Sequence, residues 1–266
     1  MAEARMSIHP TAIIEAGAEL GADVEIGPFC HVGASVKLHD GVVLKSHVVI
    51  DGATQIGART IIYPFAAIGA PPQHLGYKGE ATKLIIGADN IIREHVTMNN
   101  GTVAGRGVTQ IGNSGFFMIG AHVAHDCIIG DNAIFANNAS IAGHVEVGDG
   151  VFLGALCGVH QQCRIGSYAF IGGCAAVTGD IIPYASATGN HARLAGLNFI
   201  GLKRRGLPRD VIRNLRNAYK MLFADEDTFK ERFVRVREQY ADCPEVMNIV
   251  EFIGSDAPRS LMTPRR

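Results

Sequence analysis

The sequence contains no long hydrophobic run and no paired cysteine motif, and each absence excludes a class of protein. No segment offers eighteen consecutive apolar residues, and the opening MAEARMSIHP has no apolar stretch, so neither a membrane-spanning helix nor a secretion signal is indicated. The six cysteines form no CxxC pair, which argues against a disulfide framework and against a thiolate zinc site. We therefore expect a cytoplasmic protein with reduced thiols that does not insert stably into membranes.

A repeat of six residues dominates the chain. Every sixth residue from Ile8 to Ile68 is aliphatic, and every sixth residue from Ile111 to Val177 is apolar. A small residue stands four positions after each such site, and glycine often follows the site directly. The small slot holds four of the cysteines: Cys30, Cys127, Cys157 and Cys163. A cramped slot predicts a structural role for these thiols, and the recurrent glycine predicts a corner with positive φ or a close backbone approach.

A period of six is too short for a helical repeat and is typical of a parallel β-helix, in which three hexads make one triangular coil of eighteen residues. The predicted fold class is mainly β: a β-helix over residues 1–188, followed by a C-terminal α-helical domain over residues 189–266. Two segments, 69–84 and 100–110, interrupt the rhythm, and the repeat then resumes one residue out of phase. We expect loop excursions there, and we expect function at the first of them.

The C-terminal region shows helical spacing in place of hexads. The apolar residues at this spacing are Ile212, Leu215, Tyr219, Leu222, Phe229, Phe233, Val236 and Tyr240. Residues 1–188 hold 9 Lys and Arg against 15 Asp and Glu, whereas residues 189–266 hold 15 against 10. Solvated helix faces or a surface for an acidic partner explain this basic tail equally well. A nucleic-acid site is not indicated, because no aromatic stacking motif accompanies the arginines.

The stretch GAHVAHDCIIG, residues 120–130, places two histidines and an aspartate in the apolar rhythm. With eighteen residues per coil, Gly143 and Gln161 stack on His125 in the next two coils, and coils lie roughly 4.8 Å apart. His125, His144 and His160 are predicted to lie along this one edge within roughly 10 Å, and His122 lies half a hexad earlier in the sequence. Several imidazoles on one edge indicate a functional site.

His125 and Asp126 are suited to general-base catalysis. An imidazole accepts a proton at cellular pH, and an adjacent carboxylate holds its tautomer and stabilises the imidazolium. The nearest thiol, Cys127, belongs to the cramped slot, so a thiolate nucleophile is not expected. We therefore predict direct attack on an acyl donor, without a covalent enzyme intermediate.

Five stretches, AHVAHDC, ANNASIAGHVEVGD, VHQQCRIGSYAFIGG, GNHARLAGLN and GLKRRG, together resemble the UDP-N-acetylglucosamine O-acyltransferase family of hexapeptide-repeat acyltransferases. The resemblance implies a left-handed β-helix and a homotrimer with active sites between adjacent solenoids. It implies transfer of an (R)-3-hydroxyacyl chain from acyl carrier protein to the 3-position of UDP-N-acetylglucosamine, the first step of lipid A biosynthesis. It also implies no metal, and no cofactor beyond the phosphopantetheine arm of the acyl carrier protein. The basic tail would then be the surface that binds this acidic carrier protein.

The resemblance also implies roles for individual residues. His125 matches the general base, Asp126 its orienting partner, and the Gly143 backbone N–H the oxyanion donor. The residues matching the sugar and thioester site are His122, His144, His160 and Gln161. The residues matching the UDP site are His191, Asn198, Arg204 and Arg205. Phe170 and Gly173 match a hydrocarbon ruler, where the missing side chain of Gly173 predicts a longer acyl chain.

The first loop departs from the family pattern. It reads PPQHLGYKGE, with His74 and Gly76 where many members have an acid and then a lysine, and Lys78 is the cation nearby. In the family this loop reaches the sugar in the neighbouring subunit's site. A neutral His74 could accept a hydrogen bond from an amine, so the 3-amino analogue of the sugar stands as an alternative acceptor to the 3-hydroxyl sugar.

Two other classes of function share features with this pattern. A histidine-zinc hydratase on the same fold would also carry histidines along an edge, but His122 and His125 are three apart, and His144 and His160 lie coils away. A non-catalytic scaffold with a basic helical cap would leave the line of histidines unexplained. The sequence therefore favours an acyltransferase over both.

Overall fold

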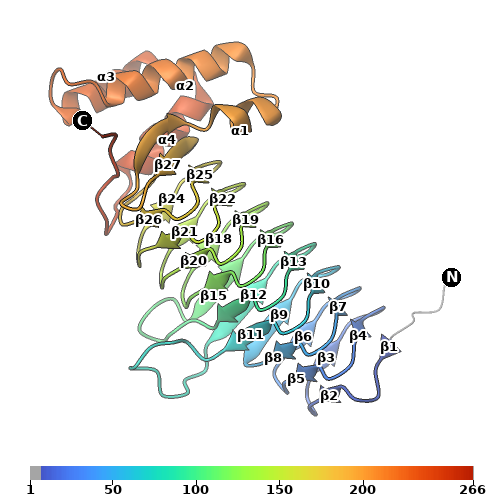
Figure 1. Cartoon of the computed structure of the whole chain (residues 1–266). Helices are drawn as coiled ribbons and strands as arrows, with labels where there is room; N and C mark the ends of the chain where they lie inside the picture. The colour runs from blue at the N-terminus through green and yellow to red at the C-terminus, as the bar shows by residue number, and fades with distance from the viewer. Residues whose placement is uncertain (1–6, 266) are drawn as a thin grey trace.

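The computed structural model describes residues 7–265, so residues 1–6 and 266 of the two predicted domains lie outside the described part of the chain. The chain winds into a left-handed parallel β-helix that carries a group of helices at its C-terminal end, as predicted (Figure 1). Two loops project from one side of the solenoid, and the N-terminal coil lies at the end opposite the helices. The fold class expected from the six-residue period is thus confirmed.

Three sheets form the faces of the solenoid. The first contains β1 (Ser7–Ile8), β4 (Glu25–Ile26), β7 (Val43–Leu44), β10 (Ile61–Ile62), β13 (Ile91–Ile92), β16 (Phe116–Phe117), β19 (Ile134–Phe135), β22 (Phe152–Leu153), β25 (Phe170–Ile171), β27 (Ala185–Thr188) and β28 (Arg193–Leu197). The second contains β2 (Ile13–Ile14), β5 (His31–Val32), β8 (Val49–Ile50), β11 (Ala67–Ala70), β14 (Thr97–Asn99), β17 (His122–Val123), β20 (Ser140–Ile141), β23 (Gly158–Val159) and β26 (Ala176–Val177). The third contains β3 (Glu19–Leu20), β6 (Lys37–Leu38), β9 (Ala53–Ile56), β12 (Lys83–Ile86), β15 (Val108–Ile111), β18 (Ile128–Ile129), β21 (Glu146–Val147) and β24 (Arg164–Ile165).

The register of these sheets shows where the coils are regular and where they are interrupted. His122 pairs with Ser140, one regular coil of eighteen residues later. By contrast, Lys83 pairs with Ala53, thirty positions earlier, and with Val108, twenty-five positions later. The extra residues form two loops, at 71–82 and at 100–107, between the flanking strands. We call the first the outer loop and the second the cap loop.

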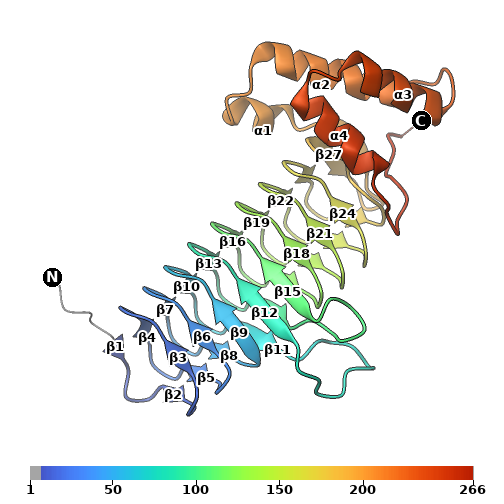
Figure 2. The ribbon, with the colours of Figure 1, turned by 180° about the vertical axis from the view of Figure 1, so that it is seen from behind.

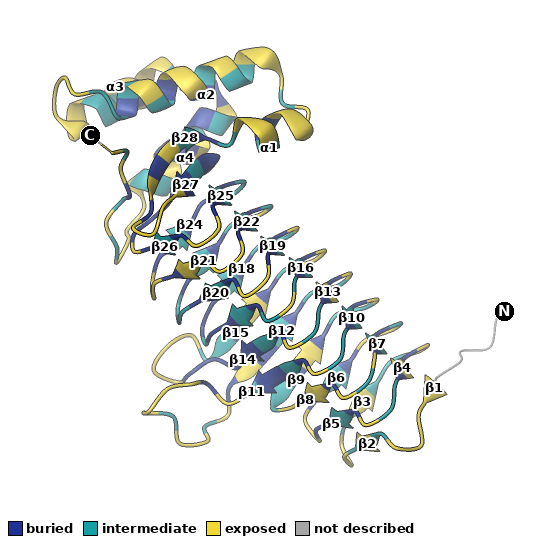
Figure 3. Cartoon of the chain, viewed as in Figure 1, coloured by how far each residue is buried: buried dark blue, intermediate teal, exposed yellow. Residues whose placement is uncertain are grey.

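The hexad-site side chains from Ile26 onward and the residues of the small slots fill the interior, whereas Ile8 in the first coil is 40% exposed. Figure 3 shows buried residues along the strands of the solenoid. The four slot cysteines are buried, and burial raises the pKa of Cys127 to about 12 and those of Cys157 and Cys163 to about 11. Thiols with such high pKa values are protonated near neutral pH and are poor nucleophiles. Their environment is that of packed apolar side chains.

The recurrent glycines are predicted to allow either positive φ or a close backbone approach at the corners. A Cβ added at Gly27 would lie 2.0 Å from the carbonyl oxygen of Lys45 in the next coil, so the backbones approach too closely for a side chain. The left-handed conformation falls instead two positions later, for example at Asp126 (φ 60°) and His144 (φ 62°). The corner thus imposes positive φ on the residues that carry the candidate chemistry.

A hairpin and four helices close the C-terminal end. β27 and β28 pair antiparallel, and the predicted domain boundary at 188/189 falls in the turn between them. The helices are α1 (Phe199–Arg204), α2 (Arg209–Leu222), α3 (Phe229–Gln239) and α4 (Pro244–Gly254). Figure 2 shows α4 next to the last coils, where the Arg164 guanidinium lies 4.5 Å from the Phe252 ring centroid. No helix in residues 7–265 has the length and hydrophobicity to cross a membrane.

Candidate active site

The corner between the second and third sheets carries the histidines. His125 and Asp126 lie in the turn from β17 to β18, and Gly143 lies one coil further along the same edge. A Cβ added at Gly143 would lie 2.6 Å from His125 Cε1, so the imidazole rests directly on the glycine. Among the described residues the Gly143 N–H donates no hydrogen bond. A free N–H beside the imidazole is what an oxyanion donor requires.

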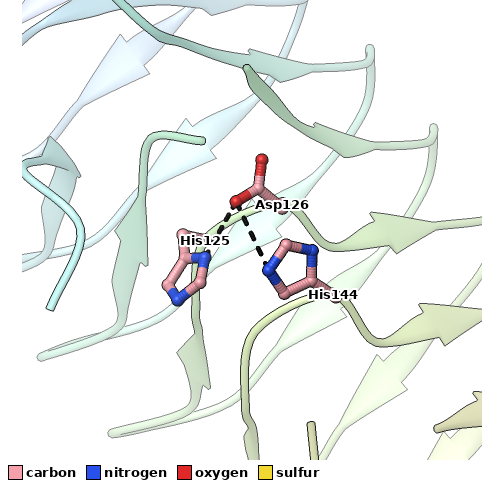
Figure 4. A group of neighbouring side chains, drawn as sticks. All are labelled: His125, Asp126 and His144. Carbon is pink, nitrogen blue, oxygen red and sulfur yellow. Dashed lines mark hydrogen bonds and ion pairs between the residues drawn. The ribbon is translucent and has the colours of Figure 1, made fainter. Parts of the chain in front are cut away.

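The carboxylate of Asp126 fixes the tautomer of His125. Asp126 is fully buried, and its Oδ2 lies 2.8 Å from His125 Nδ1 (Figure 4). A carboxylate only accepts hydrogen bonds, so Nδ1 carries the proton and donates it. The other ring nitrogen, Nε2, therefore keeps its lone pair and is the basic atom.

The cap loop supplies the remaining partners of this carboxylate. Thr102 donates to Asp126 through its hydroxyl at 2.6 Å and through its backbone N–H at 3.1 Å. The backbone N–H of Arg106 donates to Asp126 Oδ1 at 2.8 Å. Burial by itself would raise the pKa of Asp126, but these donors and His125 outweigh it and hold the pKa below its usual value. Thr102 and Arg106 are not predicted from the sequence, because a loop outside the repeat has no register relative to Asp126.

His144 packs against both His125 and Asp126. Its ring meets that of His125 edge to face with centroids 5.1 Å apart, and its Nε2 lies 3.9 Å from Asp126 Oδ2 (Figure 4). Burial lowers the pKa of His144, so the neutral ring is favoured. His125, Asp126 and His144 offer ligand atoms within 4.8 Å of one another, as a metal would need. Both carboxylate oxygens also accept hydrogen bonds from the cap loop.

A groove of about 620 Å³ opens beside His125 along the second sheet. The predicted residues that line it are His74, His122, His125, Gly143, His160 and Gln161. The outward positions of the next strands, Ser140, Gly158 and Ala176, also line the groove and carry little bulk. A groove that begins at a basic imidazole and continues over small side chains accommodates a polar reacting group and a slender apolar chain.

Three further histidines border the groove. His122 Nδ1 lies 2.8 Å from the Thr97 hydroxyl, and burial lowers the pKa of this histidine. The exposed His74 of the outer loop meets the His125 ring edge to face with centroids 5.4 Å apart, so this loop lies over the site of its own chain, whereas the resemblance implies the site of a neighbouring subunit. His160 is exposed, and its Nδ1 lies 3.2 Å from the backbone oxygen of Gln161.

The residues expected at the UDP site lie outside this groove. Asn198 accepts from the Gly201 N–H and so caps α1. The Arg205 guanidinium lies 3.9 Å from the Tyr168 ring centroid and donates to the Gly150 carbonyl. His191 and Arg204 are exposed near the C-terminal end. Within one chain, the structure does not bring these four residues to His125.

The remaining expected residues have separate positions. Phe170 stacks on Phe152 in the first sheet, with ring centroids 5.4 Å apart. Gly173 is exposed in the turn between the first and second sheets, across the second sheet from the histidine edge. The backbone N–H of Lys78 donates to Glu80 within the exposed outer loop, outside the lining of the groove.

Known proteins resemble this chain over nearly its full length. Residues 17–52, 109–143 and 144–179 match the family model of bacterial transferase hexapeptides, and residues 180–262 match domain 2 of the UDP-N-acetylglucosamine O-acyltransferases. The acyl-[acyl-carrier-protein]–UDP-N-acetylglucosamine O-acyltransferase of Caulobacter vibrioides is 59% identical over 98% of this chain and 99% of its own length.

Solved structures of similar proteins share the whole architecture. The UDP-N-acetylglucosamine O-acyltransferase of Moraxella catarrhalis is 41% identical with a TM-score of 0.92, covering 96% of this chain and 99% of that one. The UDP-N-acetylglucosamine acyltransferase of Francisella novicida is 35% identical with a TM-score of 0.94, covering 97% and 95%. With identity at this level over nearly the full length, the chain belongs to the UDP-N-acetylglucosamine O-acyltransferase family.

Proposed function

We propose that this protein transfers an (R)-3-hydroxyacyl chain from acyl carrier protein to the 3-hydroxyl of UDP-N-acetylglucosamine, the first step of lipid A biosynthesis. The observation that carries the proposal is the hydrogen bond between the buried Asp126 carboxylate and His125 Nδ1, which leaves Nε2 as the proton acceptor of the neutral imidazole beside the groove. We place the reaction in the cytoplasm, together with its carrier-bound donor. The similar Caulobacter protein has the same activity in its name.

In this proposal the side chains and backbone of the protein act directly on the two substrates. His125 Nε2 accepts the proton of the sugar hydroxyl while the hydroxyl oxygen attacks the thioester carbonyl carbon. The Gly143 N–H donates to the oxyanion of the tetrahedral intermediate. Collapse breaks the carbon–sulfur bond, and the departing thiolate of the phosphopantetheine arm takes the proton back from His125. Asp126 stabilises the imidazolium between these steps.

The groove gives the other residues their roles in this proposal. His122, with its pKa lowered by burial, is a neutral hydrogen-bonding partner for the sugar. His160 and Gln161 line the same groove for the sugar and the thioester. The acyl chain lies over the small side chains of the second sheet and ends near the ruler position Gly173.

We propose a homotrimer in which a neighbouring chain completes each site. Along the corner between the first and second sheets, the rings of Phe29, His47, Phe65 and His95 form a row with successive centroids about 5 Å apart. Phe29 is 58% exposed, Phe65 53%, and Leu156 on the same corner 62%. A long exposed apolar edge is typical of an interface. A neighbour packed there would bring its own UDP-site residues, His191, Asn198, Arg204 and Arg205, toward the groove.

The basic C-terminal helices support acyl carrier protein as the donor's partner. Their exposed arginines include Arg209, Arg213 and Arg216 on α2. Carrier proteins of this kind are acidic, so opposite charges favour encounter.

A second acceptor, the 3-amino analogue of the sugar, is supported by one contact. His74 lies against His125 where many family members have an acid, and a neutral imidazole accepts a hydrogen bond from an amine. Measuring kcat/KM for both acceptors with one acyl donor separates the two. A hydroxyl preference above about tenfold, or 1.4 kcal/mol, excludes the amine as preferred acceptor.

The general-base step is tested by His125→Ala. We expect kcat to fall by ~10² to 10⁴, the usual range for losing a positioned base, while sedimentation shows an unchanged oligomer. His31→Ala is the matched control, because His31 lies on the same sheet but far from the groove. Near-normal turnover of the His125 variant contradicts the mechanism.

A further inference from the structure

Arg106 in the cap loop forms hydrogen bonds both to Asp126 and to the following coil. Its backbone N–H donates to Asp126 Oδ1 at 2.8 Å, and its Nη1 donates to the backbone oxygen of Asp126 at 3.0 Å. Its Nη2 donates to Glu146 Oε1 on β21. One residue thus holds both the carboxylate and the backbone of the aspartate that orients His125, and fastens them to the neighbouring strand.

The cap loop itself lies directly on the catalytic pair. A Cβ added at Gly105 would lie 2.5 Å from Asp126 Oδ2 and 2.6 Å from His144 Cε1. The backbone of the loop therefore covers the carboxylate, which is 0% exposed. Covering the carboxylate keeps water from competing with His125 for Oδ2.

The sequence of the cap loop does not make it rigid. Gly101, Gly105 and Gly107 all lie in this segment, and Gly107 has φ 71°. Glycine has the greatest backbone freedom of any residue, so such a segment has many alternatives to the observed conformation. Its position consequently depends on the side chains that tie it to the solenoid, and Thr102 and Arg106 both make such ties.

We propose that Arg106 is a positioning residue for catalysis: paired with Glu146, it clamps the cap loop over Asp126 and so maintains the Asp126–His125 hydrogen bond. Arg106 acts through Asp126 and does not touch the reacting atoms. The fork of the guanidinium reaches two acceptors on different coils at once, which a lysine ammonium does not match. The effect on turnover rests on the proposed function, whereas the effect on the loop does not.

The kinetic test compares Arg106→Gln, Arg106→Lys and Glu146→Gln. The side chains of Arg106 and Glu146 are 36% and 42% exposed, so solvent moderates the effect. We expect Arg106→Gln to lower kcat about tenfold with KM changed less than about twofold. We expect Arg106→Lys and Glu146→Gln to lose less, because each keeps one half of the clamp.

Arg59→Gln is the matched control. Arg59 forms a bidentate ion pair with Asp89 in the next coil, on the corner between the third and first sheets and away from His125. We expect this variant to keep wild-type kcat. A loss of kcat equal to that of Arg106→Gln would show that any broken inter-coil ion pair suffices, and would overturn the proposal.

A double-mutant cycle separates positioning from general stability. If Arg106 acts through Asp126, adding Arg106→Gln to Asp126→Asn lowers the residual kcat less than about twofold. An additional tenfold loss in that background, or wild-type turnover of Arg106→Gln alone, overturns the proposal.

Hydrogen exchange tests the clamp without any assay of activity. The N–H groups of Thr102 and Arg106 donate to Asp126, so we expect Arg106→Gln to speed their exchange at least about tenfold, and Arg59→Gln to leave it unchanged. Unchanged exchange refutes the clamp. If the wild-type protein transfers no acyl group, the proposed function fails, and the exchange result alone decides whether Arg106 positions the loop.

Discussion

Replacing Asp126 by asparagine changes the charge of the orienting group while keeping its shape. The carboxylate receives hydrogen bonds at both oxygens, from His125 and Thr102 at Oδ2 and from Arg106 N–H at Oδ1. An asparagine has one acceptor oxygen, so its amide nitrogen must face one of these donors. If the nitrogen faces Arg106, the partly buried N–H of Arg106 loses its acceptor, which weakens the attachment of the cap loop.

Either orientation of the amide weakens the base. With the oxygen toward His125, the hydrogen bond survives, but the negative charge that stabilises the imidazolium is lost. With the nitrogen toward His125, the ring must present a bare Nδ1 and carry its proton on Nε2, where it no longer acts as a base. We expect kcat to fall by ~10² to 10³, which is about 2.7–4 kcal/mol at 1.36 kcal/mol per tenfold.

The measurement is kcat for acyl transfer, alongside thermal unfolding of the same protein. Asp149→Asn is the matched control, since Asp149 Oδ1 also accepts from a backbone N–H, that of Asp131 in the previous coil, at a corner remote from His125. We expect the control to keep wild-type kcat. Turnover of Asp126→Asn within about threefold of wild type, with the control also normal, would refute the role given to this carboxylate.

Three further predictions follow from charge, groove shape and pH. Arg204→Ala should raise KM for the UDP-sugar, because a guanidinium that binds phosphate is lost. The double variant Arg213→Ala, Arg216→Ala should slow association with acyl carrier protein in a salt-dependent way. If carrier binding does not depend on ionic strength, the basic helices are only a solvated face. Gly173→Met should shorten the preferred acyl donor, which mass spectrometry of products from mixed donors checks, and an unchanged profile would remove Gly173 from the ruler. The lowered pKa of Asp126 adds stability that is fully present above its unfolded pKa, about 3.9, and is lost as pH falls through the lower folded value. The Tm of Asp126→Asn should therefore fall less between pH 5 and acid than that of wild type, and parallel acid curves would contradict this linkage.

The fold follows from the sequence because its repeat is local. A side chain at every sixth position must point inward if three hexads close one coil, so Ile8 to Ile68 and Ile111 to Val177 specify the solenoid without knowledge of any distant contact. The coil length also places Gly143 one coil from His125, and the structure has that stacking. The left hand comes from the family resemblance, since the period of six is the same for both hands.

The contacts of the cap loop and of the C-terminal region could not be predicted from the six-residue period. No register relates Thr102 or Arg106 to Asp126, because the cap loop breaks the repeat, and their hydrogen bonds depend on how that loop closes in space. The expected UDP-site residue Asn198 caps α1, and Arg205 stacks on Tyr168, contacts that no spacing in the sequence indicates.

The sequence by itself determined the solenoid, its buried thiols and the edge on which His125 and its neighbours lie, because an eighteen-residue coil converts positions along the chain into positions in space. Only the tertiary structure decided how the edge works. The hydrogen bonds that hold the buried carboxylate of Asp126 and the contact of His74 with His125 both depend on loops that fold back over the repeat. Such contacts join residues whose separation in the sequence has no fixed period, so only packing brings them together.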